Sequence, residues 1–196
     1  MSCRLLPDKH PLDVGKDADT LRGLQLKAIA IRRFILDLGA RRKIRLHYGA
    51  IMDRHPGVLK DTIVWNIEAG RKLSAAQLAR AEKLRTALFI RMHRFMEKYD
   101  FLVMPVNQVP PFDIAQPFVD EIAGVKMENY IDWMRSCYYI TATTHPALSV
   151  PAGFPGDGLP VGMQIVGRHQ GELALLQMGY GFEQATRVGM RNPSCV

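Results

Sequence analysis

The stretch Tyr139–Gly167, YITATTHPALSVPAGFPGDGLPVGMQIVG, decides the fold class of this 196-residue chain. It holds two short apolar runs, Ala147–Val150 and Gly162–Val166, separated by a loop rich in glycine and proline. Apolar runs of this length between turn-forming residues indicate buried strands rather than helices. Pro146 and Pro151 flank the first run. Because proline cannot donate to a strand ladder, we expect each of them to mark a strand end.

The segments around these two strands predict helices and a third strand. Ser74–Gln77 forms a capping-box pattern before a long apolar stripe that ends at Tyr99, which predicts the clearest helix of the chain. We expect a short buried strand at Phe101–Pro105, a helix over Tyr130–Thr141 and a final helix from about Glu172 to Thr186. Helices that alternate with three short apolar strands indicate an α/β layered domain.

The rest of the chain is predicted from local signals. A helical stripe runs from Thr20 to Leu38, and Gly39 stands where that helix would end. Asp53–Lys60 is expected to be a loop around its Pro-Gly pair, and Val109–Phe118 an extended, proline-rich loop. Leu59–Gly70 fits either helix or strand, and helix is favoured.

The opening stretch also carries a family resemblance. Its pattern H-P-A-L-S-V-P-A-G-F, then G-L-P-V-G-M-Q-I-V-G, then E-L-A-L-L-Q with F-E-Q-A-T, resembles the C-terminal end of amidase signature enzymes. Three segments further upstream resemble the C-terminal third of the same family, namely Thr62–Glu68, Tyr99–Pro105 and Tyr130–Met134. The resemblance covers about Leu46 to Ala185, and the residues before it resemble the family only weakly.

The resemblance implies a scaffold without its catalyst. The family fold is an α/β/α sandwich around a large mixed sheet, so this chain is expected to hold only the C-terminal strands and their flanking helices. Family members hydrolyse amide bonds with a serine nucleophile, a second serine in a cis peptide and a lysine, and a Gly/Ser-rich loop stabilises the oxyanion. These groups lie in the N-terminal half of the family. No Gly/Ser-rich stretch occurs in this chain, so no catalytic residue is carried over.

The same resemblance suggests a part of the substrate pocket. It implies that Tyr130–Tyr138 and Thr141–His145 lie near the family's pocket. Trp133, Cys137 and Thr143 are our candidates for substrate-facing positions. For all three the alternative is core packing.

The residues themselves predict no other reaction centre. None of the five serines lies in a G-x-S-x-G elbow or starts an S-x-x-K motif. Ser149, inside a predicted strand, is expected to be buried or hydrogen-bonded. The six histidines lack metal-binding spacing, and His93 and His145 are expected to be structural polar positions. The three cysteines form no C-x-x-C pair, and Cys137 is expected to be an inert, buried thiol. We therefore expect no metal site and no cofactor.

The net charge of +7 sits at one end of the chain. The first 60 residues hold thirteen lysines and arginines against six aspartates, while the remainder holds thirteen basic and thirteen acidic residues. Such an asymmetry can form an arm that binds an acidic partner or nucleic acid. The alternative is a solvated helix face. It is favoured because no aromatic residues interleave the basic ones, as single-strand binders usually require. Nucleic acid is therefore not an expected partner.

These observations lead to a prediction for the whole chain. Residues 1–45 are expected to form a lead and a basic amphipathic helix, residues 46–186 the C-terminal part of an amidase domain, and residues 187–196 a tail. No apolar run approaches the roughly 20 residues that a membrane span needs. The N-terminus shows no secretory leader. A reducing, cytoplasmic location is expected from the cysteine usage.

The predicted function is that of a C-terminal fragment of an amidase-family hydrolase. Its family substrate would be a small-molecule amide, and the chain alone is expected to be inactive. Unpaired strand edges are expected to cause self-association. Two alternatives stay open. The chain could be a non-catalytic interaction module that acts through residues 20–60, or a subunit that completes a separately encoded amidase half.

Overall fold

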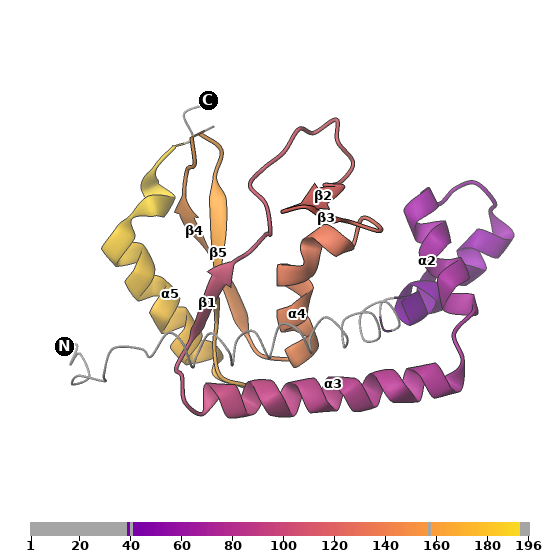
Figure 1. The fold of residues 1–196 in the computed structure, drawn as a ribbon, viewed down its shortest axis with the longest axis horizontal. Helices are drawn as coiled ribbons and strands as arrows, with labels where there is room; N and C mark the ends of the chain where they lie inside the picture. The colour runs from indigo at the N-terminus through magenta and orange to yellow at the C-terminus, as the bar shows by residue number, and fades with distance from the viewer. Residues whose placement is uncertain (1–38, 40, 157, 193–196) are drawn as a thin grey trace.

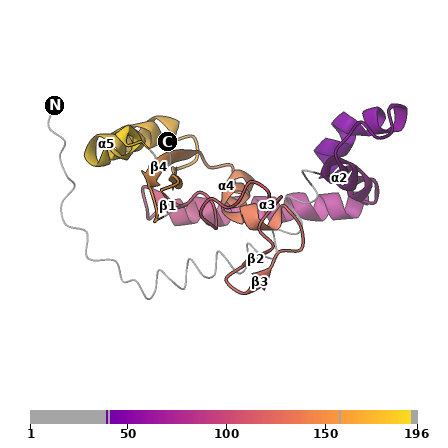
Figure 2. The ribbon, with the colours of Figure 1, turned by 90° about the horizontal axis from the view of Figure 1, so that it is seen from above.

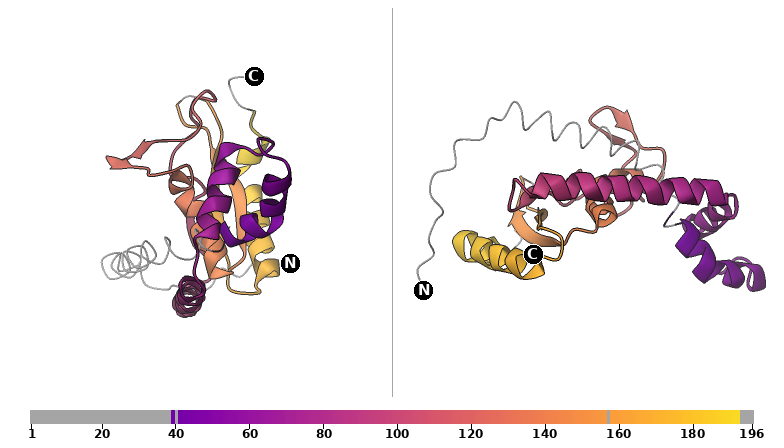
Figure 3. Two further views of the ribbon diagram at one scale, coloured as in Figure 1. Left: turned by 90° about the vertical axis from the view of Figure 1, so that its right-hand side faces the viewer. Right: turned by 90° about the horizontal axis from the view of Figure 1, so that it is seen from below.

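The computed structural model describes residues 39, 41–156 and 158–192. Helix α3 (Ala75–Met96) runs along one side of the molecule and joins a helical head, residues 41–71, to a three-stranded sheet with its own helices (Figure 1). Views from above and below show the head at one end of α3 and the sheet toward the other (Figures 2 and 3). The helix predicted over residues 20–38 lies outside the described residues.

The capping box predicted at Ser74 starts α3. The Ser74 hydroxyl oxygen accepts a hydrogen bond from the backbone N–H of Gln77 (3.2 Å), and the Gln77 side chain accepts one from the backbone N–H of Ser74 (2.9 Å). These two bonds satisfy amide groups that a helix start otherwise leaves unpaired. The buried residues of α3 share one stripe at helical spacing: Ala81, Leu88, Met92 and Met96. The predicted helix is confirmed.

The helical head consists of a helix over 41–54 and helix α2 (Asp61–Arg71), with a turn between them. The favoured helical interpretation of residues 59–70 is confirmed. A Cβ atom at Gly70 would lie 2.7 Å from the backbone oxygen of Arg41, so only glycine allows the two helices to approach this closely. The buried Asn66 donates to the hydroxyl of Tyr130 (2.8 Å) and ties the head to the segment before α4.

The sheet confirms the three predicted strands, β1 (Leu102–Pro105), β4 (Ala147–Gly153) and β5 (Val161–Val166). Their order is β1-β5-β4, and both pairings are antiparallel. No parallel pair occurs among the described strands of this sheet. A two-stranded hairpin, β2 (Glu121–Ile122) with β3 (Val125–Lys126), follows the proline-rich loop and was not predicted.

Pro146 directly precedes β4, as predicted, whereas the prediction that Pro151 ends the strand was wrong. The backbone N–H of Gly167 donates to the oxygen of Pro146 (2.9 Å), so residues 146, 148 and 150 are the ones whose backbone groups face β5. Pro151 falls on the alternate position, where its nitrogen faces the outer edge of the sheet. Because β4 has no neighbour on that side among the described strands, the missing N–H leaves no ladder bond unmade.

Helices cover the two faces of the sheet in separate layers. On one face, Leu102 and Met104 of β1 and Val166 of β5 pack against α3 and α4 (Arg135–Thr143). On the other face, Val150 and Ile165 pack against Leu175 of α5 (Glu172–Thr186). The α/β class and the layered helix–sheet–helix arrangement are therefore confirmed, as is the helix predicted from Glu172 to Thr186.

The two helical layers are offset, so the outer strands are covered on one side only. Helices α3 and α4 lie over β1 and β5, while α5 lies over β4 and β5 (Figure 1). As a result Val103 of β1 keeps 47% of its surface exposed on the face that α5 leaves open. Ser149 of β4 is exposed on the opposite face, contrary to the expectation that it is buried or hydrogen-bonded.

The close contact of α5 with β4 yields a stability prediction. A Cβ atom at Gly179 would lie 2.2 Å from Cδ2 of Leu148, whereas a Cβ at Gly181 of the same helix would meet no atom within 4 Å. Gly181→Ala is expected to stabilise the protein by about 0.5–1 kcal/mol through helix propensity. Gly179→Ala gains the same propensity but forces Leu148 out of its packed position, so it is expected to be less stable than Gly181→Ala by about 1–3 kcal/mol.

Urea denaturation of both variants and the parent protein measures this difference. Equal stabilisation by the two alanines would show that β4 and α5 do not pack as closely as described.

Candidate functional site

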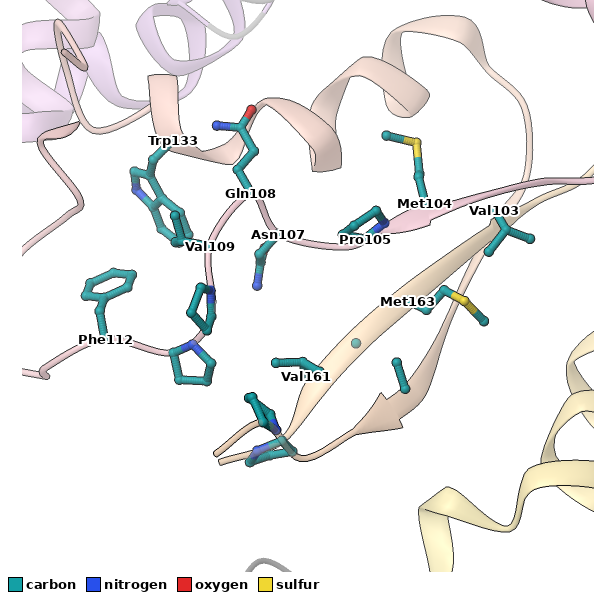
Figure 4. Close-up of a pocket in the computed structure, with 16 residues that line it drawn as sticks. Val103, Met104, Pro105, Asn107, Gln108, Val109, Phe112, Trp133, Val161 and Met163 are labelled. Atoms are coloured by element: carbon teal, nitrogen blue, oxygen red, sulfur yellow. The ribbon is translucent and has the colours of Figure 1, made fainter. Parts of the chain in front are cut away.

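An open groove of about 750 Å³ lies where the α5 layer stops covering β1 and β5 (Figure 4). Its walls come from β1 and the segment that follows it (103–105 and 107–112) and from Trp133. The end of β4 (Ala152), the start of β5 (161–163) and the connection between them (Pro155 and Pro160) complete the lining. None of the described residues that line it is charged. The volume lies within the range of small-molecule sites, and the lining is predominantly apolar, as such sites usually are.

An aromatic pair forms one wall of the groove. The rings of Phe112 and Trp133 meet edge to face, with centroids 5.4 Å apart and planes at 89°. Trp133 lies in the 3-10 turn η1 (Asp132–Met134). The buried carboxylate of Asp132 accepts a hydrogen bond from the backbone N–H of Glu128 (3.0 Å), which fixes the turn that presents Trp133.

A buried polar network holds the segment after β1 in place. The Gln164 side chain donates to the backbone oxygens of Pro105 (3.1 Å) and Ser136 (3.0 Å). The hydroxyl of Ser136 donates in turn to the backbone oxygen of Val106 (2.5 Å). Three elements, β5, α4 and the end of β1, are therefore joined by bonds to groups that burial would otherwise leave unsatisfied.

Cys137 lies directly behind the groove. Its thiol contacts the backbone oxygen of Val106 (3.1 Å) and the side-chain oxygen of Asn107 (3.3 Å), and Asn107 itself lines the groove. The thiol is half-buried rather than fully buried. It touches no histidine or lysine among its hydrogen-bond partners in the described chain, so the geometry gives it no base.

The three candidate pocket residues predicted from the sequence occupy different environments. Trp133 lines the groove, and Cys137 contacts a residue that lines it. Thr143 is buried near the end of α4, where its hydroxyl donates to the backbone oxygen of Ile140 (2.7 Å), and it does not line the groove. Asn107 and Phe112 also line the groove, although the sequence only indicated a loop around Phe112.

Three histidines gather around Phe89 of α3, near the C-terminal end of α4. The ring centroids of His93, His145 and His169 lie 5.8, 5.7 and 5.1 Å from that of Phe89. The Nδ1–H of His145 donates to the backbone oxygen of Thr143 (2.9 Å), and its buried Nε2 has no hydrogen-bond partner among the described residues. Within the described part of the chain, no group of three or more histidine, cysteine or carboxylate side chains is arranged to hold a metal ion.

The described serines are engaged in structure or stand apart from any base. Ser74 caps α3, Ser136 donates to Val106, and Ser149 is exposed on β4. No serine, lysine, histidine or carboxylate is found among the described residues of the groove wall. The described site therefore offers a binding surface without a nucleophile and base, which acyl transfer requires. Nor does any described helix have the length and apolar character to span a membrane.

Comparison with known proteins assigns the scaffold. The amidase family model matches residues 31–176. The chain is 30% identical to an acylamidase of Rhodococcus erythropolis over 128 residues, which are 65% of this chain and 27% of that protein. It is 33% identical to a glutamyl-tRNA(Gln) amidotransferase subunit of Lactiplantibacillus plantarum over 118 residues, which are 60% of this chain and 23% of that protein. The chain thus spans about a quarter of the length of these curated relatives.

Solved structures give the same result for the fold. A bacterial aryl acylamidase of the amidase signature family matches with a TM-score of 0.68 at 23% identity, over 90% of this chain and 40% of that one. A 6-aminohexanoate cyclic dimer hydrolase matches with a TM-score of 0.68 at 18% identity, over 90% of this chain and 42% of that one. At these identities the likeness concerns the fold alone.

The environment of His145 predicts a pH-dependent stability. Burial lowers the pKa of His145 below its ordinary 6.5, the bond to Thr143 partly opposes this, and positive charge on His169 or His93 would lower the pKa further. The unfolded chain therefore takes up a proton near pH 6.5 that the folded chain resists. The contribution of neutral, buried His145 to the free energy of unfolding is therefore fully present above pH 6.5. It is lost as the pH falls from 6.5 toward the lower pKa that His145 has in the folded chain.

We expect the urea midpoint of the parent protein to fall between about pH 7.5 and about pH 5.5 by more than that of His145→Asn, whose amide can still donate to Thr143. His55→Asn, at an exposed histidine before α2, serves as the control and is expected to keep the parent's pH dependence. A His145→Asn variant with an undiminished pH dependence would contradict the assignment.

Proposed function

The chain belongs to the amidase family, and from this we propose that it is the C-terminal part of an amide hydrolase that is inactive alone and becomes active with a separately supplied N-terminal part. Amide C–N bond hydrolysis is the reaction of the completed protein, and a small-molecule amide is its substrate. A reducing, cytoplasmic setting accompanies this proposal.

The observation that carries the proposal is a groove without a catalyst. The described chain presents an uncharged, partly aromatic groove, yet no described serine, lysine or histidine reaches its wall. An amide is too stable to be cleaved by binding alone, because a nucleophile, a base and oxyanion donors supply most of the rate enhancement. In this proposal these groups come from outside the described residues, in the N-terminal part.

The uncovered parts of the sheet favour a partner at this place. Val103 is 47% exposed on the groove side of β1, so an apolar strand residue is left without a covering layer there. The outer edge of β1 also has no neighbouring strand among the described residues. A partner that covered this face would bury apolar surface and place its own groups next to the groove. One curated relative, from Lactiplantibacillus plantarum, is itself named as an amidotransferase subunit.

Within this proposal the groove is the wall of the substrate pocket that this chain contributes. Trp133 faces the substrate directly. Cys137 does not line the groove and positions Asn107, which does, through the contact of its thiol with the Asn107 side chain. Thr143 lies outside that wall, and its hydroxyl is engaged with the backbone of α4.

The alternative, an interaction module that acts through residues 20–60, gains less support. The guanidinium of Arg41 stacks on Trp65 at 4.6 Å, and the side chain of Arg45 donates to the backbone oxygen of Gly70 (3.3 Å). Cations that are used in packing one helix against another are less available to an acidic partner. Both contacts favour the solvated helix face over a binding arm.

The activity of the purified chain tests the proposal. We expect no turnover of acetamide, acetanilide or 4-nitroacetanilide by the chain alone. Co-expression with the product of the coding sequence that lies upstream is expected to give a stable complex with amidase activity, provided that this product contains a Gly/Ser-rich stretch. Replacement of a serine in that stretch would remove the activity.

Two results would contradict the proposal. One is turnover by the isolated chain that disappears on Ser136→Ala or Ser149→Ala, which would locate the nucleophile here. The other is a monodisperse, reversibly folding monomer that shows no complex with any product containing the Gly/Ser-rich stretch.

A further inference from the structure

A pair of histidines beyond the end of α4 takes no part in the groove. We propose that His145 and His169 together bind one divalent transition-metal ion of the Zn²⁺ or Ni²⁺ class, each through its Nε2 atom, and that water completes the coordination. The inference goes beyond the proposed function and does not depend on it.

The hydrogen bonds of the two rings determine which nitrogen of each is free. The Nδ1–H of His145 donates to the backbone oxygen of Thr143 (2.9 Å), and the Nδ1–H of His169 donates to that of the next residue, Thr144 (3.0 Å). A carbonyl oxygen only accepts, so each neutral imidazole carries its hydrogen on Nδ1 and a lone pair on Nε2. Neutral histidine is the form that binds a metal ion, and a backbone carbonyl is a usual partner of its other nitrogen.

The spacing of the rings fits one shared ion. The centroids of His145 and His169 lie 5.8 Å apart, and the ring planes are inclined at 60°. With a metal–nitrogen distance of about 2.0–2.1 Å and a tetrahedral or wider angle at the ion, two coordinating imidazoles are expected to have centroids about 5–6 Å apart. Both Nδ1 atoms are bound to consecutive carbonyls at the end of α4, so both Nε2 atoms lie on the ring edges that face away from these carbonyls.

The buried Nε2 atom of His145 is an independent reason to expect a ligand. Its side chain is only 5% exposed, and this atom has no hydrogen-bond partner among the described residues. A buried acceptor without a donor costs free energy. The neighbouring neutral ring does not relieve that cost, because the free nitrogen of His169 is an acceptor as well. A cation is a group that two neighbouring lone pairs can share.

The two nitrogen ligands select the class of ion. Imidazole suits Zn²⁺, Ni²⁺ and Cu²⁺, whereas Mg²⁺ and Ca²⁺ take oxygen ligands. The pair supplies fewer ligands than a closed structural zinc site, and within the part of the chain that the structure describes no third histidine, cysteine or carboxylate joins it. The remaining positions are left to water, and the exposed ring of His169 provides the path from solvent.

A bound ion would join three elements of the fold. His145 follows α4, His169 lies in the turn between β5 and α5, and both rings pack against Phe89 of α3, with centroids 5.7 and 5.1 Å from its own. Their spacing in the sequence matches no metal-binding motif, because the β4–β5 hairpin brings them together. An ion that needs both rings binds the folded chain and therefore stabilises it.

Asparagine substitutions remove the proposed ligands with little other change. The amide nitrogen of asparagine can replace Nδ1 as the donor to Thr143 or Thr144, while the Nε2 atom is lost. His145→Asn and His169→Asn therefore test the pair. His93→Asn, at the third histidine beside Phe89, is the matched control.

The measurement uses the intact, untagged chain at about pH 7.5, where imidazole is mostly neutral. Zn²⁺ and Ni²⁺ are titrated calorimetrically, and urea unfolding is followed with excess ion and with EDTA. We expect the parent and His93→Asn to bind the ion equally well and to unfold at higher urea with the ion than with EDTA. His145→Asn and His169→Asn are expected to weaken the affinity by at least about tenfold and to lose this stabilisation.

Placement of the ion is checked by nuclear magnetic resonance. Ni²⁺ is paramagnetic, so the Cε1–H resonances of His145 and His169 are expected to broaden at lower Ni²⁺ concentration than those of the other histidines. The variants assign these resonances.

Three results would overturn the proposal. Neither ion stabilises the parent; or His169→Asn keeps the parent's affinity, which would place a bound ion elsewhere; or His93→Asn loses as much affinity as the pair variants. Unfolding in EDTA shows whether each variant folds. His169 is exposed, so His169→Asn decides the question even where His145→Asn is unfolded.

Discussion

The burial of β5 is the constraint on which the rest of the structure depends. Ile165 and Val166 are fully buried on opposite faces of this central strand, so both faces need a helical layer. Gln164 precedes them in the strand, only 5% exposed, and a polar side chain in that position has to be hydrogen-bonded. Its bonds to Pro105 and Ser136 satisfy the side chain and, at the same time, position β1 and α4 relative to β5.

The groove is a consequence of this arrangement. The network from Gln164 through Ser136 to Val106 fixes the direction in which the chain leaves β1, and Asn107 and Phe112 follow within a few residues. Because α5 covers only β4 and β5, nothing among the described residues closes over Val103. The hydrogen-bonded segment after β1, the Phe112–Trp133 wall and the uncovered face of β1 therefore occur together. None of these three features supplies a catalytic group.

Local signals in the sequence predicted most of the fold and little of the groove. The strands and α5 were predicted because an apolar run between turn formers determines its own structure. Pro151 was misplaced because its tolerance depends on which side of β4 lacks a neighbour, and that is a property of the sheet. Asn107 was not predicted as a groove residue because its position depends on a contact with Cys137, far along the chain. Trp133 was identified only through the family resemblance.

The separation of binding from chemistry has a consequence for how this chain contributes to catalysis. Contacts from Trp133 and Phe112 would act on the apolar substituents of an amide, which change little between the ground state and the transition state. Such uniform binding lowers KM without raising kcat. The groups that stabilise the tetrahedral oxyanion and supply the nucleophile raise kcat, and they lie in the other part of the family's fold. If the proposed division holds, substitutions in this chain change the choice of amide, and the rate of the chemical step is determined by its partner.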